Sequence, residues 1–263
     1  MKKFIIAVAA VICAAFIWHA AYYRLGLYID LHPDASVEAI MTVEGKEIYI
    51  WKDGEKEPFE IRGVDMGSGM PGEWSTDYAI DKDRYMRWFG QIQDMGANTI
   101  RVYTLLGDDF YNAFYEYNKD RDEPLYLVQG VWVNDYIQNS HRDAYDDEFR
   151  QTFLDDCRTA VDALHGSRIV SLGYGKGSGS YQKDVSPWVI GYILGGEWED
   201  VTIEYTNKKY PERDSYQGKY LYTAETATPF EALLCEAGDK LLEYESQRYK
   251  QQKLIAFANG PVT

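Results

Sequence analysis

The feature that most constrains the fold is a repeated alternation between short apolar runs and longer segments of helical periodicity, beginning near residue 59. The apolar runs predict strands over 59–66, 98–105, 125–133, 188–195 and 254–258, and the periodic segments predict helices over 81–95, 108–117, 146–164 and 228–249. A helix between two strands returns the chain to its starting edge, so the next strand runs in the same direction. The alternation therefore predicts an α/β fold with a parallel sheet.

Helix-capping residues support the boundaries of two of these helices. Asp81 can cap the first helix, and Gly96 is suited to end it. Thr228 and Glu231 have the spacing of a capping box, and Pro229 stands at the first helical position between them.

The N-terminal residues 1–24 are unlike the rest of the chain. Lys2 and Lys3 precede an apolar run over 4–23, and Arg24 ends it. Twenty residues at helical rise cover roughly 30 Å, the thickness of a bilayer core. We expect a transmembrane signal anchor, with the N-terminus in the cytoplasm and the body on the extracytoplasmic side of the cell membrane. The alternative is a signal peptide whose cleavage releases a secreted, extracellular protein.

Residues 25–57 are predicted to connect this segment to the body. The stretch 25–40 has the composition of a linker, and strand-like runs follow over 40–43 and 47–51. A short β-hairpin therefore precedes the alternating pattern, and residues 58–263 form the main domain.

Composition excludes several classes of function. The formal net charge is −15 and basic residues do not cluster within the body, so no nucleic acid partner is expected. The three cysteines, Cys13, Cys157 and Cys235, lie far apart and form no CxxC motif, and the four histidines are dispersed. Cys157 and Cys235 fall at apolar helical positions, which predicts buried thiols. We therefore expect no metal site and no cofactor.

Candidate site residues are those at the carboxyl ends of the predicted strands, where βα barrels carry their functional groups. They are Asp65, Arg101, Tyr103, Trp132, Asn134, Glu197 and Trp198. Glu197 directly follows an apolar strand, so its carboxyl group is expected to be partly desolvated, as suits a general acid for a glycosidic oxygen. A structural role for Glu197 or Arg101, in an ion pair, is the alternative. Glu199 and Asp200 are expected to be solvated loop acids.

Three of these strand motifs resemble those of the clan A glycoside hydrolases, in the correct order. The sequence Gly-Tyr-Ile-Leu-Gly-Gly-Glu-Trp at 191–198 resembles the clan's fourth strand, which carries the acid/base glutamate. The sequence Asn-Thr-Ile-Arg-Val-Tyr at 98–103 resembles the second strand, whose arginine supports the nucleophile, and 59–65 resembles the first. The resemblance extends over 58–260 and is greatest to the glycoside hydrolase family 2 barrel and to β-1,3-glucanosyltransferases.

The resemblance implies a (β/α)8 TIM barrel and a retaining glycoside hydrolase or transglycosylase acting on extracellular or cell-surface polysaccharide. It implies that Glu197 is the general acid/base and that Arg101 is a second catalytic residue. The remaining strand-end residues would bind the polysaccharide or oligosaccharide substrate, namely Asp65, Tyr103, Trp132, Asn134 and Trp198.

Two departures from the clan pattern leave catalysis open. Gly196 stands where the clan usually has an asparagine that binds a sugar hydroxyl. The barrel is also expected to be incomplete, because eight strands typically need about 250 residues and only five are predicted. The clan's nucleophile follows the seventh strand, which is not predicted here. We therefore expect a glycoside hydrolase only in a longer chain. The alternative is a non-catalytic carbohydrate-binding or surface-scaffold protein with a degenerate barrel.

Overall fold

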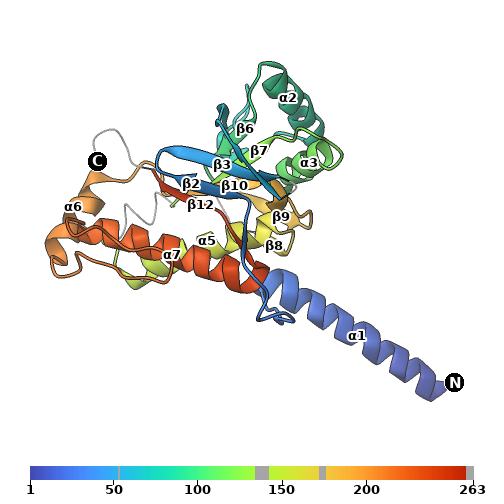
Figure 1. The fold of residues 1–263 in the computed structure, drawn as a ribbon. Helices are drawn as coiled ribbons and strands as arrows, with labels where there is room; N and C mark the ends of the chain where they lie inside the picture. Colours follow the sequence, from blue (N-terminus) through green and yellow to red (C-terminus); the bar gives the residue numbers. More distant parts are fainter. Residues whose placement is uncertain (53, 134–141, 172–175, 259–263) are drawn as a thin grey trace.

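The centre of the molecule is a five-stranded parallel sheet (Figure 1). The computed structural model describes residues 1–52, 54–133, 142–171 and 176–258. The strands lie side by side in chain order: β5 (Gly63–Met66), β6 (Thr99–Val102), β7 (Tyr126–Val131), β10 (Val189–Leu194) and β12 (Leu254–Phe257). The predicted parallel sheet and all five of its strands are confirmed.

The four predicted helices are also present. They are α2 (Lys82–Asp94), α3 (Asp108–Asn118), α5 (Asp147–Leu164) and α7 (Pro229–Tyr249). The structure adds α6 (Asp200–Lys209) and the short 3₁₀ turns Ser75–Asp77 and Ser186–Trp188, which the sequence pattern did not predict. Because strand order never reverses, right-handed crossovers bring the helices to the same face of the sheet.

The predicted caps form the expected hydrogen bonds. The Asp81 carboxylate accepts the backbone N–H of Arg84 at 2.8 Å. The Thr228 hydroxyl accepts from the N–H of Glu231, whose carboxylate accepts from the N–H of Thr228 in return. Gly96, just beyond α2, has a φ of +90°, a conformation that favours glycine.

The two faces of the sheet differ in what covers them. Alternate strand residues, such as Ile100, Val102 and Leu127, are fully buried with the helices in one hydrophobic core. The intervening residues, such as Thr99 and Val128, line a cavity of about 510 Å³ on the opposite face. In the part of the chain described, β5 and β12 are the two edges of this sheet, which does not close into a barrel.

A three-stranded antiparallel sheet covers the amino-terminal end of this second face. It consists of β2 (Met41–Glu44), β3 (Glu47–Lys52) and β4 (Glu55–Pro58), so the predicted hairpin is confirmed and gains a third strand. Met41 and Ile50 pack against Tyr126 and Ile190, which stand near the starts of β7 and β10. The carboxyl ends of the strands remain uncovered by these three strands.

Two predicted connections contain strands. The expected loop over 171–187 includes part of an antiparallel hairpin formed by β8 (Arg168–Ser171) and β9 (Ser178–Tyr181). The expected linker contains β1 (Glu38–Ala39), which pairs in parallel with β11 (Gln251–Gln252). The linker is thereby attached to the end of α7.

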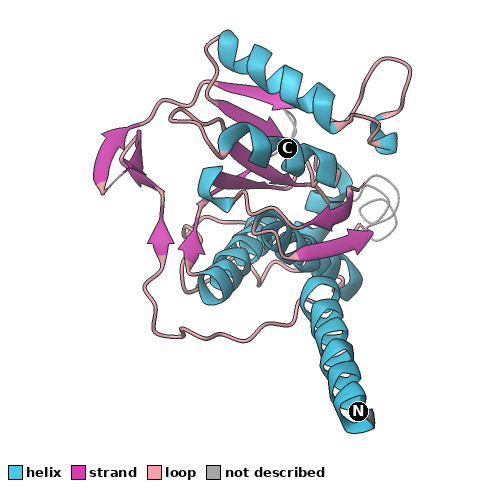
Figure 2. Ribbon diagram, turned by 90° about the vertical axis from the view of Figure 1, so that its right-hand side faces the viewer, coloured by secondary structure: helices cyan, strands magenta, loops and turns pink. Residues whose placement is uncertain are grey.

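The N-terminal helix α1 (Lys2–Leu25) projects from the body (Figures 1 and 2). It contains no buried residue. With 24 residues and a mean hydropathy of 2.4, it is long and apolar enough to cross a membrane. The predicted helix is confirmed, whereas membrane insertion remains a prediction. The predicted burial of Cys157 and Cys235 as free thiols is confirmed.

Candidate functional site

Three polar groups meet at the carboxyl ends of β5 and β6. The Tyr103 hydroxyl donates a hydrogen bond of 3.1 Å to Oδ2 of Asp65, and Nη1 of Arg101 lies 3.6 Å from the same oxygen. The Arg101 guanidinium lies 4.8 Å from the centroid of the Tyr103 ring. Parallel pairing sets Asp65 opposite Arg101, so three of the candidate strand-end residues lie together.

Trp132 extends this group across the end of β7. Its ring centroid is 6.4 Å from that of Tyr103, with an interplanar angle of 73°. On the far side, a Cβ atom built on Gly196 would lie 2.8 Å from Cε3 of Trp132. The glycine at the position of the clan's asparagine therefore leaves room for the indole ring.

Glu197 follows β10 on the same edge of the sheet. Its side chain is exposed, which differs from the expected partial desolvation. Desolvation raises the pKa of Tyr103, and the hydrogen bond to Asp65 and the charges of Asp65 and Glu197 raise it further, against the opposing charge of Arg101. Glu197 thus lies within electrostatic reach of the Tyr103 hydroxyl.

Trp198 does not belong to this exposed group. Its side chain is 4% exposed, and its ring packs against Phe149, Phe153 and Phe230 at centroid distances of 6.4, 5.8 and 5.0 Å. The turn at Gly195, with φ of +86°, brings the backbone so close to the indole that a Cβ there would collide with it. This corrects the expectation that Trp198 contacts substrate, because the ring presents no face to solvent.

The other predicted residues near this edge have different positions. Asn134 lies outside the described residues. Glu199 and Asp200, expected in a solvated loop, stand at the start of α6 instead, as its N-cap and first residue. Asp200 is exposed and Glu199 is half-buried. Acidic residues are stabilised at a helix N-terminus, which gives both carboxylates a structural reason to be there.

Gly130 is a positioning residue that the sequence pattern did not identify. A Cβ on Gly130 would collide with the backbone carbonyl of Tyr103 and with that of Val102. The absence of a side chain at Gly130 lets the ends of β6 and β7, which precede Tyr103 and Trp132, approach closely. A glycine inside an apolar strand is the signal that could have indicated this close approach.

The cavity on the face of the sheet opposite the helices reaches this cluster, because both Asp65 and Arg101 line it. The buried Nε of Arg101 has no hydrogen-bond partner among the described residues, so the guanidinium retains a donor that is not used. Within the same described ranges, no group of three or more His, Cys, Asp or Glu side chains is arranged to hold a metal ion.

Sequence similarity links the chain to one curated enzyme. No family model matches it. The 1,3-beta-glucanosyltransferase gel1 from each of two strains of Aspergillus fumigatus is 26% identical over 178 residues. The match covers 63% of this chain and 37% of the relative, so the chain spans little more than a third of the length of these relatives.

Solved structures give weaker likenesses. Two structures of the beta-glucuronidase of Parabacteroides merdae, one with glycerol in its active site, have TM-scores of 0.43 and 0.44 and 11% identity. Each match covers 80% of this chain, and the two matches cover 23% and 22% of the beta-glucuronidase chains. BpGH50 has a TM-score of 0.41 and 13% identity, covering 89% of this chain and 55% of its own. At these scores the likenesses carry no weight, and the gel1 similarity alone bears on function.

Proposed function

We propose that this chain carries the acid/base side of a carbohydrate-active site, in a retaining glycoside hydrolase or transglycosylase that acts on extracellular or cell-surface polysaccharide. The observation that carries the proposal is the convergence of Asp65, Arg101, Tyr103, Trp132 and Glu197 at the carboxyl ends of four neighbouring strands. The similarity to a 1,3-beta-glucanosyltransferase supports β-1,3-glucan as the substrate class.

Each side chain has a role suited to its environment. The exposed Glu197 carboxyl group can reach a glycosidic oxygen and protonate it. Tyr103 and Trp132 are aromatic, and their rings can pack against the C–H faces of a sugar. Asp65 holds the Tyr103 hydroxyl and Arg101 in place, and the buried Nε of Arg101 has no partner among the described residues.

A retaining mechanism needs a second carboxylate about 5–5.5 Å from the acid/base. The clan resemblance assigns that nucleophile to a strand beyond β12. Asp65 is a poor substitute, because it is already engaged by Tyr103 and Arg101. On this proposal Glu197 protonates the leaving oxygen, and the nucleophile comes from outside the described residues.

The test is a transfer and hydrolysis assay with fluorescently labelled β-1,3-gluco-oligosaccharides, run on the full-length protein that contains this chain. Glu197→Gln should lower the rate on the order of 10²–10⁴-fold, because it removes the proton donor. Glu199→Gln is the matched control and should leave the rate nearly unchanged. Activity that survives Glu197→Gln but is lost in Glu199→Gln would contradict the assignment of the acid/base.

A carbohydrate-binding protein without catalysis is the second candidate. Gly196 favours it, because the amide that the clan uses to hold a sugar hydroxyl is missing and the Trp132 ring occupies the neighbouring space. This candidate predicts oligosaccharide binding by calorimetry with no turnover. Glu197→Gln would then leave the affinity almost unchanged, which distinguishes a binding protein from an enzyme.

We also propose that α1 anchors the protein in the cytoplasmic membrane, with the body on the outer side. Its length, its hydropathy and the preceding Lys2 and Lys3 support this orientation. Protease added to intact cells should digest the body, and N-terminal sequencing should find α1 retained. A soluble protein that the protease does not reach would contradict the anchor, and a shortened N-terminus would indicate cleavage and secretion.

A further inference from the structure

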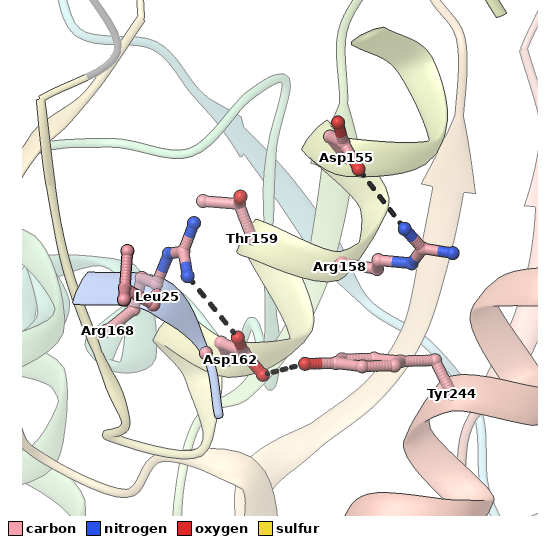
Figure 3. A pocket seen from close by; sticks show the side chains of 8 residues that line it. Leu25, Asp155, Arg158, Thr159, Asp162, Arg168 and Tyr244 are labelled. Atoms are coloured by element: carbon pink, nitrogen blue, oxygen red, sulfur yellow. Dashed lines mark hydrogen bonds and ion pairs between the residues drawn. The ribbon is translucent and has the colours of Figure 1, made fainter. Parts of the chain in front are cut away.

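A second cavity, distant in the chain from the strand-end cluster, opens where α1 meets the body (Figure 3). Its volume is about 470 Å³. The lining comes from α1 and its C-cap, from α5, from β8 and from α7, and consists of Leu25, Gly26, Asp155, Arg158, Thr159, Asp162, Arg168 and Tyr244. Four elements that are far apart in sequence thus form one concave surface.

Three arginines lie in or beside this cavity. Arg158 and Arg168 line it, and Arg248 lies directly behind Gly26, with Nη1 donating to the Gly26 carbonyl at 2.7 Å. Asp155 and Asp162 also line it, so the two arginines and two aspartates of the lining cancel in formal charge. Arg248 adds one positive charge behind the lining.

Guanidinium nitrogens here lack acceptors. Within the described residues, the buried Nε of Arg168 and the buried Nε and Nη2 of Arg248 have no hydrogen-bond partner, and the Arg248 side chain is only 2% exposed. Asp162 already accepts from Tyr244, Tyr249 and Arg248. Buried donors are nearly always paired, so the unused Nε of Arg168, which lines the cavity, indicates an acceptor that the described residues do not provide.

The location of the cavity indicates where such an acceptor comes from. Leu25 and Gly26 mark the end of the candidate membrane span. A helix that crosses the hydrocarbon core ends at the level of the lipid headgroups. Tyr22 and Tyr28 flank this point, with ring centroids 5.4 and 4.8 Å from the Arg248 guanidinium. Aromatic and cationic side chains together are typical of this interface.

We propose that this cavity binds the phosphate of an anionic phospholipid headgroup, an inference that rests on the proposed membrane anchor. The planar guanidinium groups match phosphate oxygens in geometry and charge. The acyl chains of the lipid lie along the exposed apolar surface of α1. The bound lipid fixes the body at the membrane surface through Arg158, Arg168 and the Gly26–Arg248 junction.

The experiment uses the full chain in a neutral detergent, with phosphatidylglycerol added and native mass spectrometry as the readout. One phosphatidylglycerol should be retained per chain. Arg168→Gln and Arg158→Gln should each weaken retention about tenfold, the effect expected for one charge-assisted hydrogen bond. Arg158 is half-exposed, so its replacement carries little risk to folding. Arg87→Gln, on the exposed face of α2, is the matched control and should retain the lipid.

Three results would overturn the proposal. They are no retention of phosphatidylglycerol, equal retention by both cavity variants and the control, and protection from unfolding by inorganic phosphate alone without lipid retention. A separate experiment distinguishes failure of the proposed membrane anchor from failure of lipid binding. Protease digestion of intact cells reports the location of the body, and Arg168→Gln leaves α1 unchanged in that assay.

Discussion

Two polar clusters in this molecule are built in opposite ways. Between the helices, Asp162 is 2% exposed and accepts hydrogen bonds of 2.8 Å from the hydroxyls of both Tyr244 and Tyr249, beside the Arg248 guanidinium at 3.3 Å. At the strand ends, Asp65 is 51% exposed and accepts a hydrogen bond from Tyr103.

The difference indicates which cluster stabilises the fold and which is open to a sugar. Buried charges of opposite sign in contact stabilise a single arrangement of the helices, because breaking a pair leaves a charge without solvent. Half-exposed groups contribute little to stability and keep hydrogen-bonding capacity for a ligand. Stability measurements and ligand measurements should therefore separate the two clusters.

The largest expected effect is on the buried cluster. Asp162→Ala should lower the free energy of unfolding by about 3–5 kcal/mol, because it leaves the Arg248 charge buried without its partner. Urea denaturation followed by circular dichroism measures this loss. Asp155→Ala is the control, because Asp155 lies about two turns earlier on α5 and its side chain is 57% exposed. Equal losses in the two variants would remove the distinction between buried and exposed carboxylates.

Asp239 tests whether another buried carboxylate behaves like Asp162. Burial raises its pKa, but hydrogen bonds from the N–H groups of Tyr220 and Leu221 and from the Tyr216 hydroxyl outweigh burial, so the net pKa is lowered. A lowered pKa contributes stability that is present above the ordinary value of 3.8 and is lost as pH falls through the lower folded value.

We expect Asp239→Asn to cost roughly 1–3 kcal/mol at neutral pH, because the amide cannot accept these three bonds equally well. The difference in free energy of unfolding between Asp239→Asn and wild type should shrink as the pH falls below 3.8. Denaturation curves recorded between neutral and acidic pH measure this difference. A difference that grows on acidification would mean that the carboxylate is destabilising in the folded state.

A smaller effect is expected at Trp132, and it should appear in binding. Loss of one aromatic contact in Trp132→Ala should weaken the affinity for β-1,3-gluco-oligosaccharides by roughly 0.5–1.5 kcal/mol, or about twofold to twelvefold. Titration calorimetry measures this change. Trp74→Ala removes an indole that is 79% exposed elsewhere and should leave affinity intact. If both variants bind alike, Trp132 is not part of the sugar site.

The smallest effect is expected at Asp65. Asp65→Asn should change stability by less than about 1 kcal/mol, as exposed ion pairs contribute little. It should also lower the pKa of Tyr103 towards its ordinary value of 10.0, because the Asp65 charge and hydrogen bond raise it. Carbon-13 labelled tyrosine observed by NMR through an alkaline titration measures the shift. An unchanged Tyr103 pKa would show that Asp65 does not contribute to it.

The parallel sheet could be predicted because its signals are local. Apolar runs defined the strands, and Asp81, Gly96 and the Thr228 capping box defined helix ends through contacts within a few residues. By contrast, α6 and the hairpin of β8 and β9 lack a strong apolar period and owe their conformation to surrounding contacts. Local patterns carry no information about such contacts.

The candidate site could be predicted from the sequence only in part. Strand order brings Asp65, Arg101 and Tyr103 together, and that follows from the parallel register. The position of Trp198 could not be predicted, because the left-handed turn at Gly195 decides which side of the sheet the next residues reach. Asp162 is polar on a helix, where the pattern alone predicts exposure, yet tertiary contacts bury it.

The direction of α7 sets the distance between the end of α1 and the candidate site. This helix begins on the side of the strand carboxyl ends and finishes at Arg248 and Tyr249, beside the end of α1 (Figure 1). Its 21 residues span about 30 Å. If α1 is embedded in a bilayer, α7 acts as a rigid spacer that raises the candidate site away from the lipid surface, at a height suited to a polymer chain lying outside the headgroup layer.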